Sequence, residues 1–303
     1  RILCLLLCLC MGVALPALAA EQPEPEATSE NGRMVLLAPV RTELGLPFLV
    51  RLTSLDPLRE ATVYWLGREV LPAVSVWNDK HIVLALLGTD VQTTEPGDHE
   101  LVVVAVTDQG RTEFTRAVTV AAKKYPVEPE RKVPALSRNE AERVEREARE
   151  AAGAVDVNTP LRRWFLPFDR PVEAEISGVY GAEALVGGRK TVRRGLDFAT
   201  QAGTQVRASG TGRVNLVADH LLAGNSVYID HGNGVVSMYF HLLRADVIVG
   251  QELERGDVIG LVGATGRAEV PKLHFAVAMQ GRLVDPQPLF NNNADGLLPA
   301  DAK

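Results

Sequence analysis

Cysteine is almost absent from the sequence. Its three cysteines, Cys4, Cys8 and Cys10, all lie within the first ten residues. If this N-terminal segment is cleaved off, the remaining chain can form no disulfide, even in a compartment that would permit one. Any metal site in that chain must therefore be built from His, Asp and Glu side chains.

Long basic runs are also missing, and the overall charge is mildly acidic. The 303 residues contain 32 Lys and Arg against 38 Asp and Glu, which gives a formal net charge of −6 at pH 7. A protein that binds nucleic acid needs clustered Lys and Arg to neutralise phosphates, so we expect no nucleic acid partner. The apolar and charged fractions, 46% and 23%, are those of a globular protein long enough to hold two domains.

One apolar run stands out, at the N-terminal end. Residues 2–15 are almost entirely apolar, and they are followed by Pro16 and an A-x-A sequence that ends at Ala19. This pattern predicts a secretory signal peptide over residues 1–20 and an exported protein of the periplasm or cell envelope, with no stable membrane span after cleavage. An uncleaved membrane anchor is less favoured, because the run is short and Pro16 interrupts it.

The N-terminal half of the sequence has the pattern of a β-sandwich. Residues 21–33 are rich in Pro, Glu and Ser, which predicts a flexible leader. Residues 34–122 contain short alternating apolar runs separated by turn signals, which predict an all-β sandwich. The segment Pro96–Gly110 resembles bacterial immunoglobulin-like modules, and this resemblance bears on the fold and hardly on function. We expect Trp65 and Trp77 in the core of the sandwich, with ligand stacking as the less favoured alternative.

The middle of the chain has the pattern of a linker. Residues 123–160 begin with three prolines among charged residues, which is typical of a semi-rigid spacer. Ser137 and Glu140 form a capping-box pattern that starts a helix predicted over residues 138–152, and Gly153 is positioned to end it. The apolar stripe of this helix is thin and mostly alanine. We therefore interpret it as a solvated spacer helix, with a partner-docking helix as the alternative.

The rest of the chain returns to short, glycine-rich β runs. Residues 161–290 contain no helix-length periodic segment, so they predict a second all-β domain, either a curved antiparallel sheet or a two-sheet sandwich. Residues 291–303 are expected to form a flexible tail.

Several segments of this second domain carry a family resemblance. The segments are Trp164–Pro171, Ser177–Gly181, Ala202–Ala208 and Gly224–Gly232. In order and spacing they resemble the lysostaphin- or LytM-type zinc metallopeptidases, which cleave the peptide cross-links of peptidoglycan. The resemblance implies an antiparallel β-domain built as a duplicated hybrid motif, and zinc as the cofactor of the family.

The resemblance also assigns the site, and it places two cations where the family has histidine. The H-x-G-x-D motif corresponds to residues 193–197, so Asp197 stands in a metal-ligand position and Arg193 replaces the ligand His. The H-x-H motif corresponds to residues 272–274, so His274 stands in a metal-ligand position and Lys272 replaces the catalytic His. His241 stands where the family has a residue that stabilises the transition state. The resemblance assigns no residue to substrate binding.

The remaining ligand set is poor for zinc. Two protein ligands, Asp197 and His274, remain where catalytic zinc takes three and a water. Arg193 cannot replace the missing His, because its guanidinium stays protonated and has no lone pair to donate. We expect zinc to be absent or weakly bound, and we do not favour the recruitment of His220 or His231, because ligand geometry is strict.

The two substitutions share a consequence for charge. Arg193 and Lys272 place two fixed cations near Asp197, about the charge that zinc would supply. We therefore predict that Asp197 pairs with Arg193, Lys272 or both, so that the metal-free site is electrostatically satisfied. The alternative is sequence drift without any particular pairing.

Three functions remain open at this point. The favoured hypothesis is an exported cell-wall protein, catalytically impaired, that binds peptidoglycan or its stem peptides or regulates another wall hydrolase. The resemblance gives this a precedent, because family members that lack metal ligands act as activators of other wall hydrolases. The second hypothesis is an active zinc endopeptidase that cleaves peptidoglycan cross-links. The third is a structural envelope protein that acts through its immunoglobulin-like domain.

Overall fold

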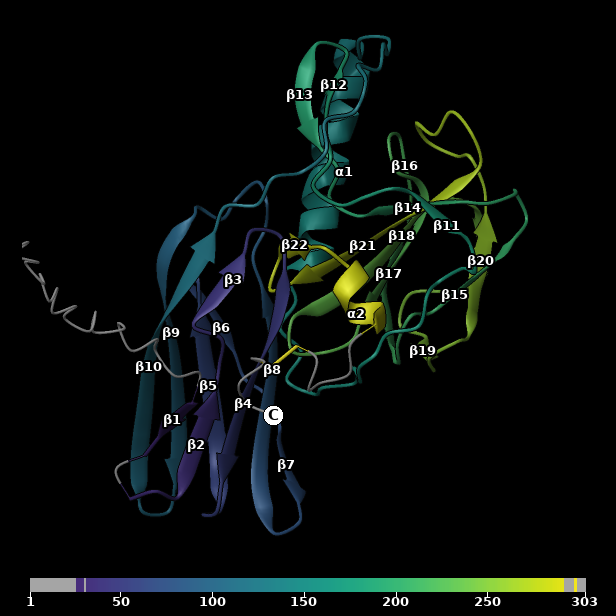
Figure 1. The fold of residues 1–303 in the computed structure, drawn as a ribbon. Helices are drawn as coiled ribbons and strands as arrows, with labels where there is room; N and C mark the ends of the chain where they lie inside the picture. Colours follow the sequence, from purple (N-terminus) through teal and green to yellow (C-terminus); the bar gives the residue numbers. More distant parts are fainter. Residues whose placement is uncertain (1–25, 30, 292–296, 299–303) are drawn as a thin grey trace, which may run out of the picture.

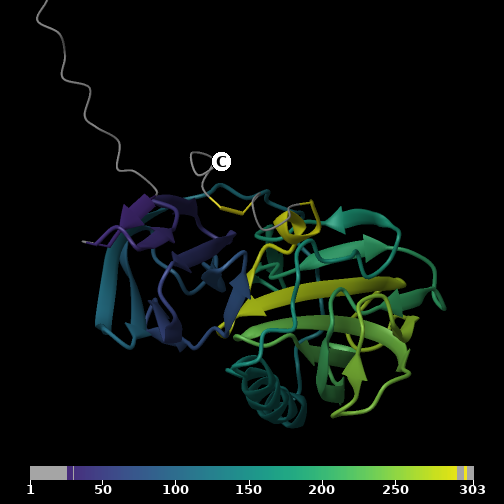
Figure 2. The ribbon, with the colours of Figure 1, turned by 90° about the horizontal axis from the view of Figure 1, so that it is seen from below.

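The computed structural model describes residues 26–29, 31–291 and 297–298. The predicted signal peptide, residues 1–20, and most of the predicted tail lie outside the described residues. The described chain consists mainly of β-strands in two parts that lie side by side (Figures 1 and 2), so the predicted all-β fold class is confirmed. Within this described part, no helix combines the length and the apolar character needed to cross a membrane.

The N-terminal part consists of two five-stranded sheets. One has the order β1 (Glu26–Thr28), β2 (Met34–Leu37), β4 (Pro47–Ser54), β8 (Lys80–Gly88) and β7 (Val74–Trp77). The other has the order β3 (Arg41–Glu43), β10 (Gly110–Ala121), β9 (Gly97–Thr107), β5 (Leu58–Trp65) and β6 (Arg68–Val70). Residues 26–28 of the predicted flexible leader (residues 21–33) form the strand β1, whose backbone pairs with the edge of β2. Residues 21–25 and 30 of that prediction lie outside the described residues.

The two tryptophans of this part have opposite environments. Trp65 is 1% exposed, its indole N–H donates to the carbonyl of Gly88 at 2.9 Å, and its ring meets Phe48 edge-on at 5.3 Å. The predicted core position is therefore confirmed for Trp65. For Trp77 it is wrong, because this side chain is 67% exposed. Trp77 lies at the end of β7, an edge strand that pairs only with β8 among the described strands.

The C-terminal part is built on one ten-stranded antiparallel sheet, which decides between the two predicted arrangements. Its main path runs β11 (Glu175–Gly178), β14 (Leu196–Ala199), β21 (Lys272–Met279), β18 (Val235–Ala245), β17 (Gly224–Asp230), β16 (Gly212–His220) and β19 (Glu252–Leu253). Beside it, β20 (Val258–Val262) pairs with β18 and with β15 (Gln205–Arg207), and β22 (Arg282–Val284) pairs with β21. A separate hairpin, β12 (Glu183–Val186) and β13 (Arg189–Val192), and a short helix, α2 (Gln287–Asn291), complete it.

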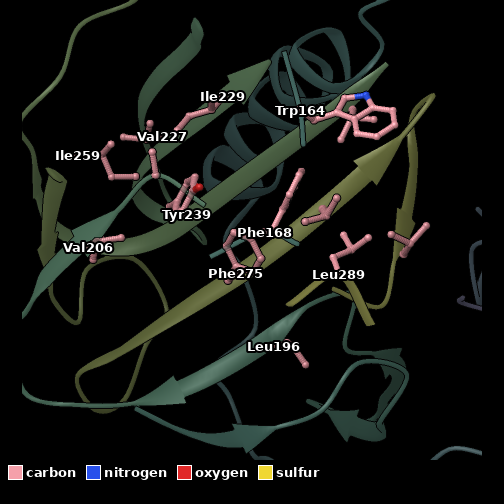
Figure 3. Packing of buried hydrophobic residues seen from close by; sticks show 14 of the residues in the cluster. Trp164, Phe168, Leu196, Val206, Val227, Ile229, Tyr239, Ile259, Phe275 and Leu289 are labelled. Atoms are coloured by element: carbon pink, nitrogen blue, oxygen red, sulfur yellow. The ribbon is translucent and has the colours of Figure 1, made fainter. Parts of the chain in front are cut away.

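An apolar core supports the central strands (Figure 3), and its buried cluster also includes residues of the N-terminal part. Tyr239 of β18 and Phe275 of β21 are fully buried, with ring centroids 5.2 Å apart. Leu49 of β4 and Leu86 of β8, neighbouring strands of one N-terminal sheet, belong to the same cluster. The strands that carry the candidate site are thus held against a core that both parts share.

The helix α1 (Arg138–Val155) begins at the predicted capping box and ends three residues later than predicted. Gly153 keeps the helical conformation, and Asp156 caps the helix through its N–H, which donates to the carbonyl of Ala152 at 2.9 Å. The last turn continues because Ala154 is buried against the sheet and its carbonyl accepts a hydrogen bond from Asn215 at 2.6 Å. Tertiary packing therefore overrides the glycine stop signal.

The preferred interpretation of α1 as a solvated spacer is also wrong. Glu147 accepts a hydrogen bond from the N–H of Leu221 at 2.8 Å, and Glu150 contacts His220 at 3.1 Å. Arg143 donates to the carbonyl of Asp219 at 3.0 Å. These contacts dock α1 on the end of β16 and on Leu221, which follows it.

The segment before α1 is docked as well. The N–H of Glu128 donates to the carbonyl of Glu183 at 2.7 Å, and the N–H of Arg131 donates to that of Leu185 at 2.8 Å. The segment therefore runs parallel to β12. Its prolines favour the extended backbone that such pairing requires. The predicted domain boundaries at residues 123 and 161 remain predictions.

Candidate functional site

Two neighbouring strands carry most of the candidate site. The strands β14 and β21 pair so that Asp197 lies opposite His274. Side chains alternate between the faces of a strand, so Lys272 and His274, two residues apart, point to the same side. The strand β18 borders β21 on its other edge and places Phe240 opposite His274. The register of these three strands brings Asp197, Lys272 and His274 together.

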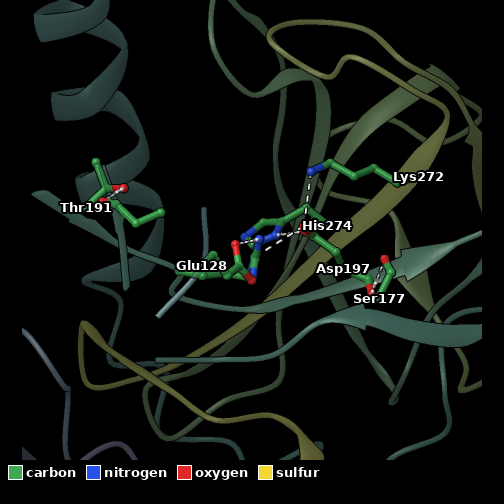
Figure 4. Close-up of polar contacts among 8 residues, drawn as sticks. Glu128, Ser177, Thr191, Asp197, Lys272 and His274 are labelled. Carbon is green, nitrogen blue, oxygen red and sulfur yellow. Dashed lines mark hydrogen bonds and ion pairs between the residues drawn. The ribbon is translucent and has the colours of Figure 1, made fainter. Parts of the chain in front are cut away.

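Asp197 is the centre of this cluster (Figure 4). Nδ1 of His274 donates to Oδ1 of Asp197 at 2.6 Å, and Nζ of Lys272 donates to Oδ2 at 3.0 Å. Nε of Arg193 lies 3.2 Å from the same Oδ2. The predicted pairing of Asp197 with the two cations is confirmed, and it includes both of them.

The environment of Asp197 keeps it ionised. Burial is the largest single influence and on its own would raise the pKa of this carboxyl group. The hydrogen bond and charge of His274, together with the charges of Lys272 and Arg193, outweigh burial, so the pKa of Asp197 lies well below its usual range. The buried negative charge is therefore balanced by the groups around it.

Arg193 reaches the cluster from the connection between β13 and β14, and Gly178 makes room for it. A Cβ added at Gly178 would lie 2.7 Å from Cζ of Arg193 and 2.9 Å from its Nε. The Arg193 side chain is only 12% exposed. The guanidinium is thus held in a narrow space over β11.

Glu128, which the sequence analysis did not single out, completes the site. It lies in the segment before α1, 65 residues before Arg193, and its carboxylate oxygens bind both terminal nitrogens of the guanidinium, with Nη2 and Oε2 2.8 Å apart. Burial would lower the pKa of Arg193, but the pairs with Glu128 and Asp197 raise it, so the guanidinium stays charged. A lone acidic residue in a proline-rich segment gives no sequence signal for this contact.

His241 borders the cluster in a constrained conformation. Its φ of 62° lies in the left-handed region, and its ring centroid is 6.3 Å from that of His274. Nδ1 of His241 donates to the carbonyl of Thr265 at 3.0 Å. Burial, and then the charges of His274 and Lys272, lower the pKa of His241 to about 4. The ring is therefore neutral at pH 7, and Nε2 carries its lone pair.

A cavity of about 690 Å³ opens over these residues. The segment before α1, the β12–β13 hairpin, α1 and the strand ends of the sheet contribute to its lining. Acidic side chains at its wall are Glu128, Asp197 and Glu269. Twice as many basic side chains line it, namely Arg131, Arg189, Arg193, Arg194, Arg267 and Lys272. The cavity therefore has an excess of positive charge.

The other two histidines of this part are committed elsewhere. His231 is fully buried, with Nδ1 2.8 Å from the carbonyl of Thr211 and Nε2 2.8 Å from Oγ of Ser237. His220 contacts Glu150 on α1. Neither lies in the cluster around Asp197.

The residues present do not fit a catalytic zinc ion. Both carboxylate oxygens of Asp197 already accept hydrogen bonds, and the two replacing side chains, Arg193 and Lys272, are cations that repel a metal ion. Throughout the described ranges, no three His, Cys, Asp or Glu side chains form a group that could hold a metal. We therefore derive no catalytic step through zinc.

The antiparallel sheet, with Asp197 of β14 opposite His274 of β21, agrees with the LytM-type β-domain that the sequence resembles. Residues 191–286 match the model of peptidase family M23, and the chain therefore contains an M23 peptidase domain. That range includes the five site positions that the sequence analysis named, and Glu128 lies outside it. The recognition of a lysostaphin- or LytM-type domain is thus confirmed.

The chain is also similar in sequence to named cell-wall proteins. Over 97 residues the chain is 43% identical to the peptidoglycan DD-endopeptidase ShyA of Vibrio cholerae, a match that covers 32% of this chain and 23% of ShyA. Over 96 residues it is 38% identical to the murein hydrolase activator EnvC of Escherichia coli, covering 31% of this chain and 23% of EnvC. The matches thus span about a quarter of the length of these relatives.

A solved structure resembles a larger share of the chain. It is that of a putative M23 peptidase from Pseudomonas aeruginosa, with a TM-score of 0.59 and 29% identity. The match covers 76% of this chain and 87% of that one. Since the M23 match spans fewer than 100 residues, the structural similarity extends beyond the domain that carries the site.

Proposed function

We propose that this protein is an exported cell-wall protein that binds peptidoglycan, or regulates a wall hydrolase, through an M23 domain that does not cleave. The observation that carries the proposal is the state of Asp197. Its carboxylate, which the family resemblance places in a metal-ligand position, is held by His274, Lys272 and Arg193. A metal ion would have to displace at least one of these groups and would gain at most two protein ligands.

The named relatives support a role at the cell wall, and one of them supports regulation of a wall hydrolase. ShyA is named a peptidoglycan endopeptidase and EnvC a murein hydrolase activator, so the domain type occurs in proteins that cut the wall and in one that activates such enzymes. The charge compensation at Asp197 favours the role of an activator, because a buried carboxylate with fixed cationic partners is stable without metal. Peptidoglycan, its stem peptides or another wall hydrolase would then be the partner.

An active zinc endopeptidase is the second candidate. The 43% identity to ShyA and the neutral His241 beside an open cavity favour it. It requires zinc to bind with Arg193 and Lys272 both turned away from Asp197. The two candidates therefore differ in a single measurable quantity, the zinc content of the purified protein.

Metal analysis and digestion of purified sacculi test the proposal. We expect the wild-type chain to hold no stoichiometric zinc, to leave sacculi uncut and to be retained on them in a pull-down. The double variant Arg193→His with Lys272→His is expected to gain zinc. The matched control Lys132→His with Arg138→His adds two histidines at exposed positions outside the cluster and is expected to gain none.

Stoichiometric zinc together with cleavage of sacculi by the wild-type chain would overturn the proposal in favour of the active enzyme. A double variant that binds zinc and cuts would show that the cavity still fits the substrate. One that binds zinc and cuts nothing would show that the cavity has diverged as well.

A further inference from the structure

Arg193 contacts two carboxylates, that of Asp197 in the cluster and that of Glu128 outside it. Asp197 contacts Nε, on the inner side of the guanidinium, whereas Glu128 binds the two outer nitrogens, Nη1 and Nη2. This fork-to-fork geometry is the one by which arginine recognises the carboxylate of a ligand. Glu128 is 28% exposed and lines the cavity, so its carboxylate lies where a bound molecule would meet Arg193.

The surrounding wall favours an anionic ligand. In the described part of the chain, Arg131, Arg189 and Arg267 form no ion pair with an acidic side chain, although all three line the cavity. Positive charge inside a concave site concentrates anions there. The volume of about 690 Å³ lies in the range of small-molecule and peptide sites.

We propose that Arg193, assisted by Lys272, binds a carboxylate of a peptidoglycan stem peptide, and that Glu128 occupies this position when no peptide is bound. The inference rests on the proposed function, because it takes the cavity as the peptide-binding site. The exchange needs only a rotation of the Glu128 side chain. The backbone around it stays paired with β12 through hydrogen bonds of 2.7 and 2.8 Å.

Competition for one guanidinium has a direct consequence. Glu128 and the ligand carboxylate cannot both bind Nη1 and Nη2, so removal of the Glu128 charge strengthens ligand binding. If the pair of Glu128 and Arg193 only stabilises the fold, removal of the Glu128 charge should weaken ligand binding or leave it unchanged, because no ligand carboxylate would bind the freed guanidinium.

Isothermal titration of the full chain with a synthetic stem peptide tests this competition. Glu128→Gln is expected to bind the peptide with free carboxylates about tenfold more tightly than the wild type, which corresponds to about 1.4 kcal/mol. The same peptide with its carboxylates amidated is expected to show no such gain. Glu130→Gln is the matched control: it removes the same charge from the same segment at an exposed position and is expected to change affinity by less than ~2-fold.

Arg193→Gln provides the second arm. It is expected to abolish the preference for free carboxylates and to remove the effect of Glu128→Gln, with circular dichroism as the check on folding. Equal affinity of the wild type and Glu128→Gln for the free-carboxylate peptide would overturn the inference. Sacculus binding by all variants without a carboxylate preference would overturn it and leave the proposed function standing. If neither the wild type nor any variant binds sacculi, the proposed binding of peptidoglycan is overturned as well.

Discussion

Gly178 offers a test of whether the fixed position of the Arg193 guanidinium stabilises the protein. A Cβ added at Gly178 would lie 2.7 Å from Cζ of Arg193 and 2.9 Å from both Nε and Nη1, which no real Cβ contact tolerates. The end of a free arginine side chain would move aside at little cost, but this one is held by Glu128 and Asp197. Gly178→Ala must therefore stretch or break at least one of these pairs.

The expected magnitude follows from two opposing effects. A hydrogen bond to a charged group contributes about 1.5–3 kcal/mol to stability. Alanine in place of a strand glycine returns about 0.5–1 kcal/mol through the unfolded chain. We expect Gly178→Ala to lower the free energy of unfolding by about 1–2 kcal/mol, measured by urea denaturation of the full chain.

Two further variants make this test specific. Gly153→Ala in α1 meets no atom within 4 Å and is expected to raise the free energy of unfolding by about 0.5–1 kcal/mol. In an Arg193→Ala background the clash is absent, so Gly178→Ala is expected to be neutral or stabilising there. A Gly178→Ala chain as stable as the Gly153→Ala chain would show that the guanidinium moves freely and that its pairs contribute little.

Two predictions concern the dependence of stability on pH. Lys272→Met removes one cation from the carboxylate of Asp197, so it is expected to cost about 1–2 kcal/mol from pH 7 down to pH ~3, because the pKa of Asp197 in the folded chain lies well below its usual range and the carboxyl stays ionised there. A cost that disappears between pH 7 and pH 3 would contradict this. Burial lowers the pKa of His231 to about 4 in the folded chain, below the ordinary value of 6.5, so the unfolded chain binds the extra proton between these values. Folding stability is therefore expected to fall from pH 6.5 to pH 4 by on the order of 3 kcal/mol from this residue, and His231→Gln, compared by urea denaturation across that range, is expected to flatten the dependence.

The part of the site that lies on strands could be predicted from the sequence. In β21 the fully buried Leu273 and Phe275 alternate with Lys272 and His274, so the strand and its polar face follow from the pattern. The pairing of Asp197 with the two cations also followed, because opposite charges close to a buried carboxylate stabilise it. The sequence displays the alternation of β21 directly, whereas the closeness of Arg193 and Lys272 to Asp197 was implied by the resemblance to the LytM-type motifs.

Contacts and environments that are set by distant parts of the chain could not be predicted. Glu128 pairs with a residue 65 positions away, and no spacing rule connects them. The end of α1 was predicted at Gly153 from local propensity, but packing of Ala154 against the sheet decided otherwise. Trp77 was expected in the core because tryptophan is usually buried, and the position of β7 at a sheet edge leaves it exposed. In each case tertiary context outweighed a local preference.

The geometry also shows why two substitutions, and not one, characterise this site. Lys272 and Arg193 both contact Oδ2 of Asp197, whereas His274 donates to Oδ1. Either cation alone would therefore keep Oδ2 occupied and positively compensated, and loss of one would leave the carboxylate paired. Glu128 extends this redundancy outward, because it gives Arg193 a second anion to bind if Asp197 is taken by Lys272. A carboxylate with two cationic partners on one oxygen is thus a stable metal-free arrangement, and a return to metal binding requires both cations to leave it together.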